Sequence, residues 1–131
     1  MGMPFAAALK VLIVDDQFSV RQMTRMTLQE IGIKHIHESE NGKEAFEKAV
    51  VQPLDLIISD YNMPEMDGLG LLRSVRGHQA VRKVPFILLT GRGDRELVVK
   101  AAQAGVNNYL IKPFTAAILR EKIEQVIGKL S

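Results

Sequence analysis

The chain contains no cysteine and no tryptophan, and its net charge at pH 7 is only +2. Without cysteine it can form no disulfide and perform no thiol chemistry, which fits a reducing compartment, so we expect a cytoplasmic protein. Its 131 residues predict one domain that buries roughly two-thirds of its unfolded surface, enough to fold without a disulfide or a metal ion.

Long hydrophobic runs and stacking aromatics are also scarce. No apolar run approaches the length of a membrane-spanning helix, and residues 1–8 lack the basic start of a signal peptide, so no membrane association is expected. Five Phe and two Tyr are available for stacking, and the Lys and Arg residues are dispersed along the chain. Both features argue against nucleic-acid binding.

Short apolar runs alternate with helix-like segments along the whole chain. The runs occupy residues 9–14, 33–38, 54–58, 84–89 and 109–111, and each is followed by apolar residues at helical spacing. Strict alternation with short connections is typical of a parallel sheet covered by helices on both faces, and right-handed crossovers leave few topologies. We therefore predict an α/β fold, a doubly wound sheet of five parallel strands with five helices.

Capping residues predict where several of these helices begin. Ser19 with Gln22 has the form of a capping box, in which each side chain bonds the other residue's main-chain N–H. Asn41, Asp94 and Thr115 are suited to cap the second, fourth and fifth helices through a side-chain oxygen.

Four of the five predicted strands end in a charged or hydroxyl side chain. These are Asp15 and Asp16 after the first strand, Asp60 after the third, Thr90 after the fourth and Lys112 after the fifth. Taken singly, each is explained as a helix cap, a turn residue or a solvated rim charge. Because the carboxyl ends of parallel strands lie side by side, the presence of such side chains after four strands predicts that they converge.

Three carboxylates held close together repel one another unless cations compensate. Lys112 supplies one positive charge, and Mg²⁺ is the natural second, because one or two carboxylates usually hold it together with water and phosphate oxygens. Asp60 is then the candidate nucleophile, since carboxylates form acyl phosphates in phosphotransfer enzymes. Metal, ammonium and hydroxyl would stabilise the charge on the transferring group. The pattern therefore predicts a magnesium-dependent phosphoryl-transfer site.

Four motifs contain these side chains: Val14-Asp15-Asp16, Ser59-Asp60-Tyr61-Asn62-Met63-Pro64-Glu65-Met66-Asp67-Gly68, Thr90-Gly91 and Lys112-Pro113-Phe114-Thr115. In this order they strongly resemble the receiver domain of bacterial two-component response regulators, over residues 10–130, and in particular the single-domain chemotaxis regulators of the CheY type. The resemblance implies a flavodoxin-like fold with strand order 2-1-3-4-5, an order that CheY itself exemplifies. It also implies a receiver domain at residues 9–131, after an N-terminal extension at residues 1–8.

For the site, the resemblance implies a role for each residue. Asp60 would accept a phosphoryl group from a phosphohistidine on a sensor histidine kinase and become a 4-aspartylphosphate. Asp16 and Asp60 would bind Mg²⁺ directly. Asn62 would contribute its main-chain carbonyl to the ion, and Asp15 would act on it largely through water. Lys112 would pair with the phosphoryl group, and the Lys112-Pro113 peptide bond would be cis.

Thr90 and Tyr109 are the switch residues that the resemblance implies. Thr90 would move toward the phosphoryl group, and Tyr109 would rotate inward behind it. The fourth helix, fifth strand and fifth helix would then present an altered surface to a protein target. We expect that target to be the flagellar motor switch and the protein itself to be a monomer. In this family, the residues at the positions of Asn62 and Arg92 tune dephosphorylation.

Two other functions stay open at this point. A phosphate sink or phosphorelay intermediate would use the same chemistry without a motor output, and the sequence does not distinguish between these roles. An aspartate-nucleophile phosphatase resembles a pattern with a second acid two residues after the nucleophile, where this chain has Asn62, and this counts against it. We accordingly expect catalysis only of the protein's own phosphorylation and dephosphorylation, and no DNA-binding output within this chain.

Overall fold

Five strands form a single parallel sheet in the order β2-β1-β3-β4-β5, in a computed structural model that describes residues 5–91 and 95–131. Every neighbouring pair in this sheet is parallel. The strands are β1 (Lys10–Val14), β2 (His35–Ser39), β3 (Leu56–Asp60), β4 (Phe86–Thr90) and β5 (Asn108–Ile111). The predicted sheet and its strand order are confirmed.

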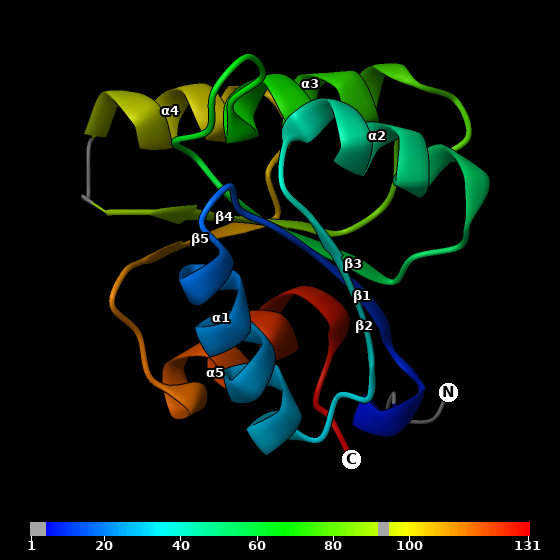
Figure 1. The fold of residues 1–131 in the computed structure, drawn as a ribbon, viewed down its shortest axis with the longest axis vertical. Helices are drawn as coiled ribbons and strands as arrows, with labels where there is room; N and C mark the ends of the chain where they lie inside the picture. The colour runs from blue at the N-terminus through cyan, green and yellow to red at the C-terminus, as the bar shows by residue number, and fades with distance from the viewer. Residues whose placement is uncertain (1–4, 92–94) are drawn as a thin grey trace.

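Helices cover both faces of this sheet, as Figure 1 shows. One face carries α1 (Phe18–Ile31) and α5 (Ala116–Ile127). The other carries α2 (Gly42–Val51), α3 (Gly68–Gly77) and α4 (Arg95–Gln103). The doubly wound arrangement is therefore as predicted. Within residues 5–91 and 95–131, no helix combines the length and the apolar character needed to cross a membrane.

The core consists of two apolar clusters, one on each face of the sheet. Val11 and Ile13 of β1 belong to the cluster under α1 and α5, whereas Leu12 and Val14 belong to the cluster under α2, α3 and α4. All residues of β3 and β4 are buried. Strands that are covered on both faces carry continuous rather than alternating apolar residues, which is why these segments stand out in the sequence.

Three strands begin two residues later than their apolar runs predict. β2, β3 and β4 begin at His35, Leu56 and Phe86. The residues that open two of the runs are nevertheless packed inside: Ile33 is fully buried, and Leu54 packs against the cluster under α2 and α3. An apolar run therefore records burial, and burial extends beyond the first hydrogen-bonded pair of the sheet.

Two of the predicted helix caps are present. The Asn41 side chain accepts a hydrogen bond of 2.8 Å from the Glu44 N–H at the start of α2. Thr115 caps α5 in the same way, with 3.2 Å from its hydroxyl oxygen to the Ile118 nitrogen. The cap predicted at Asp94 lies outside the described residues.

The capping box predicted at Ser19 was wrong. Helix α1 already starts one residue before Ser19, with Gln17 in the capping position and no side-chain cap. The Gln17 N–H instead donates to Oδ1 of Asp15 at 2.9 Å, and the side chain of Gln22 donates to Glu38 on β2. Because α1 starts at Phe18, the N–H of Gln22 already lies inside the helix, where it needs no side-chain cap from Ser19.

A short 3-10 helix, η1 (Ala6–Ala8), precedes β1. We predicted an N-terminal extension over residues 1–8, and Ala6 within that stretch is buried in the cluster under α1 and α5. Its N–H donates to the main-chain oxygen of Ser131 at 3.1 Å. The start of the described chain is thus joined to its end beside the amino ends of the strands.

Candidate functional site

The register of the sheet brings the predicted site residues together at the carboxyl ends of the strands. In the ladder between β1 and β3, the residue before Asp15 pairs with the residue before Asp60. In the ladder between β4 and β5, Thr90 pairs with the residue before Lys112. The Lys112 N–H also donates to the Thr90 carbonyl at 2.8 Å. Four side chains that are far apart in the sequence therefore leave adjacent strands at nearly the same height.

Three carboxylates meet at this edge. One oxygen each from Asp15, Asp16 and Asp60 lies within 4.8 Å of the other two. Asp15 and Asp60 are buried, and Asp16 is exposed, so the cluster is open to solvent on one side. Such a set of hard oxygen donors with one open side suits a magnesium ion that keeps several of its waters.

Lys112 provides the positive charge of the site. Its ammonium lies 2.6 Å from Oδ1 of Asp60 and 3.9 Å from Oδ2 of Asp15. Within residues 5–91 and 95–131, Lys112 is the one cation paired with these two buried carboxylates, so the described part of the cluster carries an excess of negative charge. The peptide bond between Lys112 and Pro113 is cis, as the family resemblance implies.

The carboxyl of Asp15 has a pKa above its ordinary value. Burial raises the pKa of its carboxyl, and the charges of Asp60 and Asp16 raise it further, while the Gln17 N–H and Lys112 oppose the shift. Its Oδ1 accepts the hydrogen bond from Gln17, but Oδ2 is buried and, among the described residues, has no hydrogen-bond partner. A buried oxygen without a hydrogen bond, beside two further carboxylates, fits a divalent cation, which would coordinate the oxygen and reduce the repulsion.

A pocket of about 340 Å³ opens over the cluster. It is lined by Asp16, Gln17, Asp60, Tyr61, Asn62, Thr90, Gly91 and Lys112. Thr90, the last residue of β4, is buried, whereas Asn62 is exposed at the rim. The structure therefore brings Asp15, Asp16, Asp60, Asn62, Thr90 and Lys112 together, as the sequence predicted. Arg92, expected near the hydrolytic water, lies outside the described residues.

Tyr109, the second predicted switch residue, lies on the edge strand β5. It is half-buried and packs against the cluster under α2, α3 and α4. The ammonium of Lys122, on α5, lies 5.6 Å from the centroid of its ring. This cation–π contact, which the sequence did not reveal, links the ring to α5.

Gly68 has a steric role that could not be predicted. A Cβ at this position would lie 2.3 Å from the carbonyl oxygen of Asp60 and 2.7 Å from a methyl group of Leu88. The Gly68 N–H also donates to the Tyr61 carbonyl at 2.9 Å. Only glycine lets the start of α3 lie directly against the end of β3, where Asp60 must point into the pocket.

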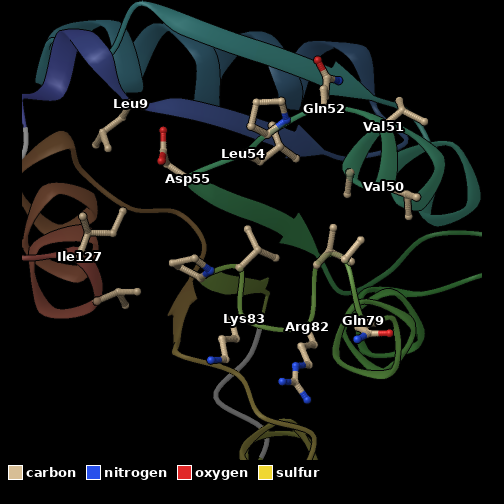
Figure 2. A pocket seen from close by; sticks show the side chains of 17 residues that line it. Leu9, Val50, Val51, Gln52, Leu54, Asp55, Gln79, Arg82, Lys83 and Ile127 are labelled. Atoms are coloured by element: carbon tan, nitrogen blue, oxygen red, sulfur yellow. The ribbon is translucent and has the colours of Figure 1, made fainter.

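A larger groove lies at the opposite edge of the sheet, beside the amino ends of the strands (Figure 2). Its volume is about 1100 Å³, and apolar residues such as Leu9, Val51 and Leu54 form much of its lining. Asp55 is the single carboxylate among the described residues that line it, and its Oδ2 accepts a hydrogen bond from the Lys10 N–H at 2.8 Å. The groove therefore lacks the charge cluster of the smaller pocket.

The sequence profile of the response regulator receiver domain matches residues 11–124. This chain belongs to the response regulator receiver family. The carboxylate cluster, the lysine with its cis peptide bond and the threonine at the end of β4 occupy one edge of the sheet in this receiver domain. The recognition made from the four motifs is confirmed.

Several curated relatives of this receiver domain are chemotaxis proteins. A probable chemotaxis protein CheY from Rhizobium etli is 45% identical over 128 residues, which cover 98% of this chain and 99% of the relative. Chemotaxis protein CheY1 from Helicobacter pylori is 41% identical over 92% of this chain and 98% of its own length. Regulators of this kind are signalling proteins rather than conventional enzymes.

Solved structures agree with this assignment. The chemotaxis response regulator CheY4 of Vibrio cholerae has a TM-score of 0.82 and 36% identity, over 90% of this chain and 98% of that one. The receiver domain of a sensor histidine kinase from Pseudomonas aeruginosa, solved with a magnesium ion coordinated in its active-site cleft, has a TM-score of 0.81 and 32% identity over 92% of this chain and 98% of that one.

Proposed function

We propose that this receiver domain is a phosphorylation-activated signalling switch, in which Asp60 accepts a phosphoryl group from a histidine kinase with the help of Mg²⁺. The observation that carries the proposal is the convergence of three carboxylates within 4.8 Å, with the Lys112 ammonium 2.6 Å from Asp60. In the transfer, a bond forms between a carboxylate oxygen of Asp60 and phosphorus, the bond from phosphorus to the histidine nitrogen breaks, and the imidazole leaves.

The residues of the cluster divide the binding of the ion among them. We assign direct coordination to the carboxylates of Asp16 and Asp60 and to the main-chain carbonyl of Asn62, and a water-mediated role to Asp15. The bound ion would neutralise charge on the phosphoryl oxygens as the donor approaches. The buried Oδ2 of Asp15, which has no hydrogen bond among the described residues, and the raised pKa of that carboxyl support a cation here, as does the magnesium ion in the related Pseudomonas aeruginosa domain.

Lys112 has two tasks in this proposal. Before transfer its ammonium orients the Asp60 carboxylate, and after transfer it pairs with the phosphoryl oxygens that replace the carboxylate charge. Thr90 would then move toward the phosphoryl group, and Tyr109 would turn inward behind it. Because Thr90 and Lys112 are joined through the ladder between β4 and β5, a shift of either reaches the strand that carries Tyr109.

The output surface in this proposal is formed by α4, β5 and α5. Three large apolar side chains on these elements are exposed: Val99, Ile111 and Ile118. Exposed apolar residues near the end of the switch strand suit a protein partner. The relatives named as chemotaxis proteins support the flagellar motor switch as that partner. The aspartate-nucleophile phosphatases have an acid two residues after the nucleophile to protonate a leaving alcohol, and this chain has Asn62 at that position, which counts against a phosphatase.

The test is phosphoryl transfer from the chemotaxis kinase of the same cell, with radiolabelled ATP, in the presence and absence of Mg²⁺. The expected result is rapid labelling that requires Mg²⁺ and is lost in Asp60→Asn. Capture of motor-switch proteins should then increase on phosphorylation. Rapid labelling without any captured switch protein would instead support a phosphate sink or relay intermediate, and labelling of Asp60→Asn at the wild-type rate would contradict the proposal.

A further inference from the structure

Arg21, in the first turns of α1, makes two charged contacts that the sequence analysis did not foresee. Its Nη1 donates to the main-chain oxygen of Asp15 at 2.7 Å, and its Nε donates to Oε1 of Glu38 at 3.0 Å. Its side chain is 11% exposed. The ring of Phe18 packs over its guanidinium, with 5.5 Å between Cζ and the ring centroid. The guanidinium is therefore held between β1 and β2 rather than extended into solvent.

The contact with Asp15 matters because of which carbonyl it involves. That oxygen belongs to the planar peptide unit joining Asp15 to Asp16, so fixing the oxygen fixes the orientation of the unit from which both side chains extend. The N–H of Asp15 is held on its other side by the carbonyl of Ser39, at 3.1 Å. The main chain of the acid pair is thus fixed at both peptide units of Asp15.

Glu38 supplies a rigid anchor for the arginine. Its carboxylate also accepts a hydrogen bond of 2.9 Å from Gln22 and forms an ion pair of 3.3 Å with Arg25. Its main-chain carbonyl accepts a hydrogen bond from the ammonium of Lys48, on α2. The planar fork of Arg21 can bridge this anchor and the acid pair at once, which a lysine ammonium cannot do with the same geometry.

We propose that Arg21 is a positioning residue for the magnesium site: anchored by Glu38, it holds the peptide between Asp15 and Asp16 so that both carboxylates face the ion. The inference rests on the proposed function, because it takes these acids as the ion's ligands. Residues that orient metal ligands without touching the metal typically change affinity by roughly 10- to 100-fold when they are replaced.

The test compares Arg21→Gln with Arg25→Gln. Arg25 contacts the same Glu38 carboxylate and donates to the Ile36 carbonyl at 3.1 Å, but the structure gives it no contact with Asp15. Isothermal titration with Mg²⁺ alone should show a dissociation constant at least about tenfold higher for Arg21→Gln and within about twofold of wild type for Arg25→Gln. Thermal unfolding of both variants, measured without Mg²⁺, separates loss of affinity from loss of stability.

A second measurement uses phosphoryl uptake from a small-molecule acyl phosphate at varied Mg²⁺ concentration. The Arg21→Gln rate should fall below wild type at low Mg²⁺ and approach it at saturating Mg²⁺, because Asp60 and Lys112 are intact. Arg21→Lys keeps the charge and serves if the glutamine variant does not fold; it should also bind Mg²⁺ more weakly than wild type. Wild-type affinity in the variants of Arg21 would overturn this inference alone. Wild-type protein that binds no Mg²⁺ would overturn the proposed function as well.

Discussion

The two edges of the sheet differ in a way that pocket size does not reveal. At the amino ends of the strands, a groove of about 1100 Å³ contains a single carboxylate among its described residues, and that carboxylate is bonded to a main-chain N–H. At the carboxyl ends, a pocket of about 340 Å³ lies over three carboxylates and an ammonium. In a parallel sheet the functional side chains lie at the carboxyl ends of the strands, and the volume of a pocket does not indicate where they lie.

The largest expected effect separates the two edges completely. Asp60→Asn should abolish phosphoryl uptake, because the amide is not a nucleophile, whereas Asp55→Asn at the opposite edge should leave uptake unchanged. The Asp55 variant should lose no more than about 1 kcal/mol of stability, since one exposed hydrogen bond changes. Labelling with radioactive phosphate measures both. Loss of uptake in the Asp55 variant would show that the two edges are not independent.

A lysine at each edge gives the next comparison. Lys112→Ala should still take up phosphate, though more slowly, and phosphorylation should no longer increase partner binding, because the ammonium 2.6 Å from Asp60 is gone. Lys83→Ala, which removes an exposed ammonium from the lining of the groove, should match wild type in both respects. The measurement is the amount of partner protein captured by each variant before and after phosphorylation. Capture by phosphorylated Lys112→Ala at the wild-type level would refute the role given to Lys112.

Two glycines of α3 sharpen the steric side of the comparison. Gly68→Ala should destabilise the protein by about 1–3 kcal/mol and displace the end of β3, because its Cβ would meet the Asp60 carbonyl oxygen. Gly77→Ala, at the other end of the same helix, has nothing within 4 Å of the added carbon and should be neutral or slightly stabilising. Urea unfolding measures both changes. Equal stabilities for the two variants would contradict the close packing of Gly68.

The smallest expected effect concerns Asp15 and pH. Because the folded protein raises the pKa of this carboxyl above its ordinary value of 3.8, the folded state binds its proton more tightly than the unfolded state does. In the absence of Mg²⁺, its contribution to stability is therefore present below that value and is lost as pH rises through the folded pKa. Asparagine does not ionise, so Asp15→Asn should not lose stability through this deprotonation. Its free energy of unfolding should therefore rise relative to that of wild type as pH increases. Unfolding free energies measured across this pH range provide the check.

Magnesium should reverse that order of stability. A ligand that binds only the folded state stabilises it by about 2.7 kcal/mol at a hundred times its dissociation constant, and Asp15→Asn should gain less from a given Mg²⁺ concentration than wild type does. Melting temperatures with and without Mg²⁺ measure the difference. An equal gain in both proteins would argue against any role of Asp15 at the ion.

Much of the fold and the site could be predicted because the signals are local. Each strand carries its own apolar run, and the acids, the threonine and the lysine sit directly at the strand ends, so parallel strands alone bring them together. The steric need for Gly68 could not be predicted, because it arises from a carbonyl on another element. Arg21 was missed for the same reason: one of its partners directly follows β1 and the other lies on β2. The capping box at Ser19 failed because α1 begins one residue earlier, at Phe18, so Ser19 is not in the capping position.

The main-chain hydrogen bond from Lys112 to Thr90 gives the molecule a built-in reporter. Its proton lies between the residue that would move and the residue that would hold the phosphoryl group. A displacement of the threonine alters the length or angle of this bond, and the resonance frequency of an amide proton is sensitive to both. In a ¹⁵N-labelled sample, one cross-peak should therefore follow the change of state without any attached dye.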